Sequence, residues 1–212
     1  DCMILYIDTS SSYLYTGIVE NGVIKKEIKK EYGHKLSEVA LPEIVSMFEE
    51  TKISPKDIKK IIVVDGPGSF TGIRIGITIA KVYAWSLNIP ITTITSLEAM
   101  AISSESNEVK VPLIDARRGY CYAAIFKEDD SEILKPSYLT YTNLQEKLTS
   151  TTKYRVITND EDKMQITALT VEQYEPNIAK IVEKYQDKEP INPHAVNPEY
   201  LKLTEAEESK AS

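Results

Sequence analysis

The chain has 212 residues, is 42% hydrophobic and carries a net charge of −7, so it can bury a full core in one large domain or two closely packed halves. The acidic balance argues against this chain alone gripping a nucleic-acid backbone, because that task needs clustered lysine and arginine. Its two distant cysteines indicate neither a disulfide framework nor a zinc site, and no apolar run is long enough for a membrane span or a signal segment. We therefore expect a cytoplasmic protein with no membrane partner.

The first fifty residues predict a β-rich start followed by a helix. Two apolar runs before residue 20, and a third after the Asn21-Gly22 hairpin signal, predict three antiparallel strands. After Gly33, apolar residues recur at helical spacing as far as Phe48, with Pro42 as the expected kink.

The central stretch, residues 61–76, predicts a buried strand, a tight turn and the start of a long helix, which Ser69 or Thr71 can cap. The amides at such a helix start can hold an anion, but glycines equally serve tight turns or close helix packing, and both interpretations stay open. Neither a Gly-Lys-Ser/Thr phosphate loop nor the third glycine of a dinucleotide fingerprint is present. The candidate residues of this stretch are Gly66, Gly68, Ser69, Thr71, Gly72 and Arg74.

Beyond the central helix, the pattern predicts a strand at residues 91–94, a short helix capped by Ser96, and a new strand, turn and strand that begin at residue 111. A single offset places Asp8 on Asp115, and the apolar residues that follow keep the same offset. An internal repeat of this kind predicts two related lobes, packed side by side with a cleft between them.

The second half is expected to be the smaller one. Its remaining pattern predicts a helix at 142–148, a strand at 155–158, a helix at 171–185 and an extended, proline-rich course from 190 to 203. The expected division is a first lobe at 1–104, a second lobe at 105–203 and a polar, disordered tail at 204–212.

A strand-ending aspartate in each lobe, facing a cleft, is similar to the arrangement by which actin, sugar kinases and Hsp70 (the ASKHA fold) hold a phosphate-bound metal. This resemblance implies an α/β fold of two lobes, each with a mixed central sheet and flanking helices. The glycines that should follow each aspartate are missing, because Asp8 precedes Thr9 and Ser10, and Asp115 precedes Ala116 and Arg117. We therefore do not expect ATP hydrolysis by this chain alone.

Several polar residues keep two interpretations at this stage. Asp8 and Asp115 are either vestigial metal-facing carboxylates or strand-end aspartates that bond their own turns. Arg117 and Arg118 either contact an anion or form surface ion pairs, which contribute only about 0–1 kcal/mol.

Six segments together resemble the TsaB (YeaZ) family: Ile7-Asp8-Thr9-Ser10, Gly66-Pro-Gly-Ser-Phe-Thr-Gly-Ile-Arg-Ile-Gly76, Asn88-Ile-Pro90, Ser96-Leu-Glu-Ala99, Asp115-Ala-Arg-Arg-Gly119 and Pro198-Glu-Tyr-Leu201. The resemblance spans nearly the whole chain. It implies a subunit of bacterial synthesis of threonylcarbamoyladenosine, placed on the adenosine 3′ of the anticodon in tRNAs that read codons beginning with A. Such proteins are similar in fold to the catalytic subunit TsaD and serve it as a non-catalytic partner, joined by the ATPase TsaE. The resemblance further implies that tRNA is reached only through the complex, with ATP and metal on the partner subunits.

No metal site is expected in this chain. The catalytic relative holds its metal with two helix histidines at positions i and i+4, whereas His34 here is followed four residues later by Glu38. The other histidine, His194, lies in the late proline-rich region.

If the chain binds a partner, it needs an exposed surface for it. Two predicted helices, the one after Gly33 and the central one that begins near Ser69, have apolar residues on more than one face. One stripe of each helix is expected to face its own sheet, which leaves the other for a four-helix contact with TsaD or, without it, with a second copy of the chain. The alternative is that both helices are enclosed within the monomer. The candidate interface residues are Leu36, Val39, Ala40, Leu41, Ile44, Val45, Phe48, Ile75, Ile79, Val82 and Tyr83.

The rival function is an enzyme of the same fold, either a small ATP-dependent phosphotransferase or a peptidase. A phosphotransferase would bind Mg-ATP through Asp8 and Asp115, and the missing glycines argue against it. A peptidase needs an activated nucleophile or a metal, and the sequence contains no Ser/His/Asp motif or histidine pair that indicates one.

Overall fold

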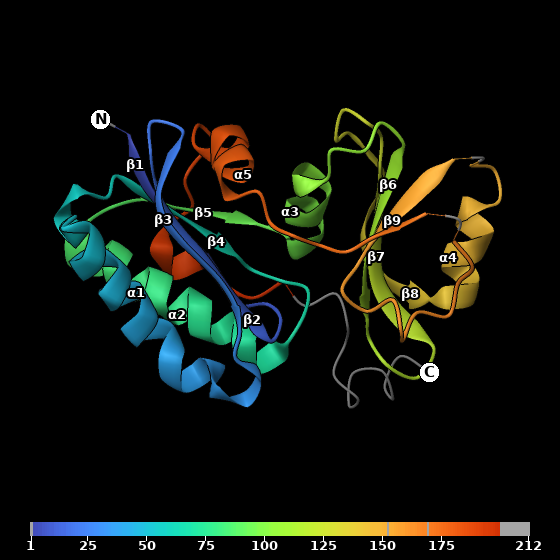
Figure 1. The fold of residues 1–212 in the computed structure, drawn as a ribbon, viewed down its shortest axis with the longest axis horizontal. Coiled ribbons are helices and arrows are strands. Elements are labelled where there is room, and N and C mark those ends of the chain that lie inside the picture. The colour runs from blue at the N-terminus through green and yellow to red at the C-terminus, as the bar shows by residue number, and fades with distance from the viewer. Residues whose placement is uncertain (1, 152, 169, 200–212) are drawn as a thin grey trace.

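The computed structural model describes residues 2–151, 153–168 and 170–199, which form two five-stranded sheets side by side (Figure 1). The expected tail at 204–212 lies outside the described residues, as do the last two positions of the Pro198-Glu-Tyr-Leu201 segment. None of the helices in the described part of the chain is long and apolar enough to cross a bilayer.

The first sheet has the strand order β3-β2-β1-β4-β5. Its first three strands are antiparallel neighbours, as the hairpin signal predicts, and β4 and β5 add in parallel. The strands are β1 (Met3–Asp8), β2 (Tyr13–Glu20), β3 (Val23–Glu31), β4 (Lys60–Val64) and β5 (Ile91–Ile94), and the helices are α1 (Leu36–Thr51), α2 (Phe70–Leu87) and α3 (Ser96–Ser103). Short 3₁₀ turns at Gly33–Lys35 and Pro55–Asp57 precede α1 and β4.

The second sheet repeats this order as β10-β9-β6-β7-β8, so its strands correspond one by one to those of the first sheet. The internal repeat and the duplicated α/β architecture are thereby confirmed. The strands are β6 (Val109–Asp115), β7 (Tyr120–Phe126), β8 (Glu132–Thr140), β9 (Tyr154–Ile157) and β10 (Val171–Glu172), and the helices are α4 (Tyr141–Leu148) and α5 (Ile178–Tyr185).

The registers correct one detail of the repeat. Asp8 lies opposite Tyr15, whereas Asp115 lies opposite Cys121. Ile7 packs toward α1 and α2, while Leu113 packs toward the corresponding helix α4. Because a shift of one residue turns a strand side chain to the opposite face, Asp115 corresponds to the position of Thr9 and not to that of Asp8. The expected pairing of Asp8 with Asp115 at one offset is therefore wrong by one residue.

The helices cover the first sheet on both faces. α1 and α2 lie side by side on one face (Figure 1). There Ala40, Ile44 and Ala80 belong to one buried cluster with Leu5 and Ile7. On the other face α3 and α5 pack against β1 and β4. α4 covers the second sheet on its outer face, and α3 also contacts the inner face of that sheet, so this helix lies between the two lobes.

The helix expected at 171–185 is a strand followed by a shorter helix. Val171–Glu172 pairs in parallel with β9, and the helix begins only at Ile178. Pro176 explains the interruption, because the residue before a proline is pushed away from helical geometry. Asn177 then caps α5 by accepting a hydrogen bond from the Lys180 amide at 3.1 Å.

The cap of α3 is Thr95 and not Ser96. The Thr95 hydroxyl accepts a hydrogen bond from the Glu98 amide at 3.1 Å. The Ser96 hydroxyl instead donates to the Pro67 carbonyl at 2.6 Å, which ties α3 to the central turn.

The end of the described chain returns to the first lobe. α5 follows the second sheet in sequence but packs on the first sheet, and the Ile191 amide donates to the Ile91 carbonyl at 2.7 Å. A 3₁₀ turn at Pro193–Ala195 interrupts the expected extended course, and Val196 is buried beneath α2. The division at residue 104/105 stays a prediction, and part of the expected second lobe packs on the first.

Candidate functional site

A cleft of about 1190 Å³ separates the lobes at the carboxyl ends of β1 and β6. Its walls combine the β1–β2 loop and the start of α2 with residues of the second lobe. Of the candidate motif and anion-binding residues, those that line the cleft are Asp8, Ser10, Gly68, Ser69, Thr71, Gly72, Asp115 and Arg117, and the candidate interface residues Leu36 and Ile75 line it as well. Thr9, Gly66, Arg74 and Arg118 are not among the lining residues.

Hydrogen bonds hold the β1–β2 loop directly against the start of α2. The Thr9 hydroxyl donates to the Gly72 carbonyl at 2.5 Å and accepts from the Gly76 amide at 2.9 Å. The Ser69 amide donates to the Ser10 carbonyl at 2.7 Å. The Ser69 hydroxyl accepts from the Gly72 amide at 3.1 Å, so Ser69, and not Thr71, is the helix cap. The donors of Ser69 and Gly72 are therefore already satisfied within the chain.

Two glycines of the motif stand where a side chain would not fit. A Cβ on Gly72 would overlap the Thr9 carbonyl oxygen, and a Cβ on Gly68, whose φ is +152°, would overlap the Ser10 carbonyl oxygen. This geometry supports the close-packing interpretation of the glycines. Anion binding by the motif stays a prediction.

We expect Gly72→Ala to lower the free energy of unfolding by about 1–3 kcal/mol, because the new methyl group overpacks against backbone. An exposed helical glycine would respond in the opposite direction, with a gain of up to about 1 kcal/mol. Urea unfolding of the monomer measures the change.

A matched pair of variants tests whether steric overlap causes the loss of stability. A Cβ on Gly76 would lie 2.5 Å from the Thr9 hydroxyl, so Thr9→Ala should relieve the cost of Gly76→Ala but not that of Gly72→Ala. Equal costs in both backgrounds would contradict the overlap argument.

Asp8 is 2% exposed and bonds its own turn: its Oδ1 accepts from the Ser10 amide at 2.8 Å and from the Ser10 hydroxyl at 2.6 Å. Burial raises the pKa of this carboxyl, and the two bonds from Ser10 oppose the rise. Within the described residues, no three His, Cys, Asp or Glu side chains are arranged to hold a metal ion.

On the opposite wall, Asp115 accepts from the Tyr141 hydroxyl at 2.5 Å and from the Arg117 amide at 3.3 Å. The Asp115 amide donates to Asp160 at 2.9 Å. Arg117 and Arg118 form the tip of the β6–β7 turn with φ values of 65° and 54°, a left-handed conformation that costs about 1 kcal/mol or more for a residue other than glycine. Both side chains are exposed, and their roles stay predictions.

Asp65, at the end of β4, is a titratable residue that the sequence analysis did not single out. Burial and the neighbouring Glu199 raise the pKa of its carboxyl to about 7. The Glu199 amide also donates to the Asp65 carbonyl at 2.6 Å. No local pattern indicates this contact, because its two residues lie far apart in the sequence.

The two-helix surface divides cleanly into buried and exposed residues. Leu36, Ala40, Ile44, Phe48 and Ile79 belong to the core of the first lobe, which corrects their assignment to an interface: their side chains already pack on the chain's own sheet. The residues of the predicted interface that remain exposed or half-buried are Leu41, Val45 and Val82, with Val39, Ile75 and Tyr83 at their edges.

Two further apolar side chains of α2 are exposed, and one of them, Phe70, lines the cleft. Phe70 and Trp85, both on α2, are 52% and 64% exposed. The Trp85 ring packs edge-on against His194 at 4.6 Å between centroids. The sequence signal was present in the helical spacing from Val82 to Trp85, which places both on one side of α2. We refer to Leu41, Val45, Val82 and Trp85 as the docking strip.

Comparison with known proteins gives a family match over residues 18–153 to TsaD, tRNA N6-adenosine threonylcarbamoyltransferase. The tRNA threonylcarbamoyladenosine biosynthesis protein TsaB of Bacillus subtilis is 29% identical over 219 residues, covering 96% of this chain and 96% of its own. The Escherichia coli protein of the same name is 29% identical over 136 residues, covering 61% of this chain and 57% of its own.

Solved structures share the fold. YeaZ from Pseudomonas aeruginosa superposes with a TM-score of 0.80 at 18% identity, covering 95% of this chain and all of that one. A second Pseudomonas aeruginosa structure, described as an uncharacterized protein with similarity to peptidase YEAZ, gives a TM-score of 0.81 at 16% identity over the same share of each chain. With the family match, this likeness confirms the duplicated ASKHA-like fold.

Proposed function

The chain belongs to the TsaB (YeaZ) family of tRNA threonylcarbamoyladenosine biosynthesis proteins, and on this premise we propose that it is a non-catalytic subunit that binds and activates TsaD. Activation here means that binding stabilises the conformation of TsaD in which its own active site is ordered. A binder can shift such an equilibrium only through its greater affinity for one of the two states.

The docking strip is the observation that carries this proposal. α1 and α2 contact each other, and the rings of Phe48 and Tyr83 meet between them at 5.9 Å between centroids. Each helix packs one side on the sheet, while Leu41, Val45 and Val82 stay 47%, 41% and 58% exposed. Two adjacent helices with a shared apolar surface suit a four-helix contact with an equivalent pair of helices.

A non-catalytic role is supported by the state of the cleft. The Asp8 carboxylate is engaged by Ser10, and the amides of Ser69 and Gly72 are engaged by Ser10 and by the Ser69 hydroxyl. These groups therefore bond within the β1–β2 loop, within the start of α2 and between the two, which leaves them engaged by the chain itself.

The proposal assigns the remaining parts of the reaction to other chains. TsaE joins the complex, tRNA is contacted through the assembly, and ATP and metal bind on the partner subunits. In the absence of TsaD, the same docking strip pairs two copies of this chain. The complex works in the cytoplasm.

The test is reconstitution of tRNA modification. TsaD and TsaE, with threonylcarbamoyl-adenylate supplied, are incubated with tRNA in the presence and absence of this protein, and modified adenosine is counted by mass spectrometry of the nucleosides. ATP binding to the isolated chain is measured by calorimetry. We expect modification only when the chain is present, and no ATP binding by the chain alone.

Two outcomes would overturn the proposal. Full modification without this protein would remove its role as a required subunit. Tight ATP binding by the isolated chain, lost in Asp8→Asn, would move it to the phosphotransferase class.

A further inference from the structure

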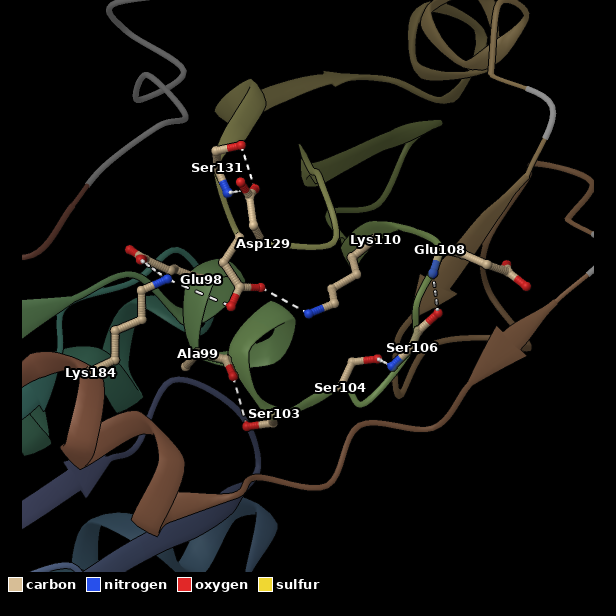
Figure 2. Close-up of polar contacts among 11 residues, drawn as sticks. Glu98, Ala99, Ser103, Ser104, Ser106, Glu108, Lys110, Asp129, Ser131 and Lys184 are labelled. Carbon is tan, nitrogen blue, oxygen red and sulfur yellow. Dashed lines mark hydrogen bonds and ion pairs between the residues drawn. The ribbon is translucent and has the colours of Figure 1, made fainter.

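A row of four side chains with alternating charge, Lys110, Asp130, Lys184 and Glu98, runs from one lobe to the other. It lies at the end of the sheets opposite to the cleft. Lys110, near the start of β6, is 2% exposed, and its Nζ lies 2.9 Å from Asp130 in the β7–β8 turn. Lys184 of α5 lies 3.6 Å from the same carboxylate and 3.9 Å from Glu98 of α3. Figure 2 shows Lys110 and Lys184 approaching this turn from opposite sides.

These ion pairs join elements that belong to different lobes. Lys110 and Asp130 come from the second sheet and its turn, whereas α5, which carries Lys184, packs on the first sheet. Glu98 is anchored on the first lobe as well, because it accepts a hydrogen bond from the Tyr185 hydroxyl. The contact between Lys184 and Asp130 is therefore the step that passes between the lobes.

The lobes also meet through an apolar cluster around α3. Leu97, Met100 and Ala101 of this helix pack with Phe126 and Ile157 of the second sheet. A cluster of this kind holds the lobes together but resists rotation about α3 less than a contact placed away from the helix. Asp115 lies five positions after Lys110 on the extended strand, which places the charged contacts about 16 Å from the cleft end of β6.

We propose that the β7–β8 turn is a latch: Asp130, held in place by the buried Lys110, engages Lys184 and so fixes the angle between the lobes and the width of the cleft. The two chain crossings, residues 104–108 and 173–177, are the segments that deform when the latch opens. This proposal is independent of the partner assignment, because it concerns the isolated chain.

The exposure of Lys184 and Asp130 to solvent sets how strongly their ion pair can hold the two lobes. The Lys184 side chain is 34% exposed and that of Asp130 is 13% exposed, so the contact is screened by solvent and resembles a surface ion pair. Its loss should raise the population of rotated conformers about two- to fivefold, with the fold itself intact.

The test compares Lys184→Met with Lys180→Met. Lys180 lies one turn earlier on α5, and the structure gives its side chain no ion pair with any described residue. Spin labels at Ser12→Cys and Asp162→Cys, on opposite walls of the cleft, report the distance between the lobes in a Cys2→Ser background, while Cys121 is buried and stays unlabelled. We expect a broader distance distribution in Lys184→Met and an unchanged one in Lys180→Met.

Amide hydrogen exchange and added salt provide two further measurements of the Lys184–Asp130 contact. Amides of the two crossings should exchange about two- to fivefold faster in Lys184→Met. Sodium chloride at about 1 M, where the screening length is about 3 Å, should broaden the distribution of the parent protein and leave Lys184→Met unchanged. Identical distributions and exchange rates in the two lysine variants, or an equal response of Lys184→Met to salt, would overturn the latch.

Discussion

Replacing Leu41 and Val82 together by glutamate is expected to weaken binding of TsaD by at least about 100-fold, which corresponds to about 3 kcal/mol. Both side chains lie on the docking strip, and both are about half exposed in the isolated chain. A carboxylate buried in an apolar contact would lose its hydration without gaining a partner, which is costly. Calorimetric titration of TsaD, together with the yield of modified tRNA, measures the loss.

The monomer should keep its stability, because neither side chain contributes to the core of the first lobe. The matched control is Val23→Glu, which changes an equally exposed apolar residue at the start of β3, away from both helices. Unfolding of the Leu41/Val82 variant would mean that the helices need these side chains internally. Normal TsaD binding by a folded variant would place the contact elsewhere on the chain.

The helical spacing of apolar residues predicts the docking strip of α1 and α2 only in part. Helical spacing predicts that one stripe of each helix faces the sheet but does not say which, and Leu36, Ala40 and Ile44, which stood among the candidate interface residues, are buried. The same spacing cannot say how wide the buried side of a helix is. Phe48 and Ile79 also stood among the candidate interface residues, and both are buried in the core of the first lobe.

The internal repeat gives the topology of both lobes but not the register of their strands. Sequence similarity at one offset is satisfied by the second strands of the two lobes, whereas the first strands are shifted by one residue. Such a shift costs little similarity in strands that are apolar on both faces, such as β1. It nevertheless decides which face of its sheet a side chain lies on, so the relation between Asp8 and Asp115 had to come from the structure.

Long-range contacts account for the other differences. The return of α5 to the first sheet depends on Ile178, Ile181 and Val182 packing against residues of β1 and β4. An amphipathic helix of this kind fits either lobe, and no local signal selects between them. The burial of Lys110 could not be predicted from the sequence either. Lysine is rarely buried unless it is paired, and the partner of Lys110 is Asp130, which lies across a hairpin.

Asp130→Asn is expected to lower the free energy of unfolding by about 3 kcal/mol. The substitution keeps the shape of the side chain and tolerates the left-handed backbone of this residue, whose φ is 67°. It removes the negative charge opposite Lys110, whose ammonium group is buried and lies 2.9 Å away. Removing one partner of a buried ion pair typically costs about 3–5 kcal/mol, because the remaining charge is left without compensation. Chemical denaturation of the isolated chain measures the change.

Two further variants separate the charge from the shape. Asp129→Asn alters the neighbouring exposed carboxylate, which accepts hydrogen bonds from the Ser131 amide and hydroxyl within the turn, and should leave the free energy of unfolding nearly unchanged. Lys110→Met replaces the buried cation by an apolar chain of similar length, and in the Asp130→Asn background it should restore most of the lost stability, because no unpaired charge then remains. If the double variant is as unstable as Asp130→Asn alone, the loss comes from the backbone of the turn and the buried pair is not its cause.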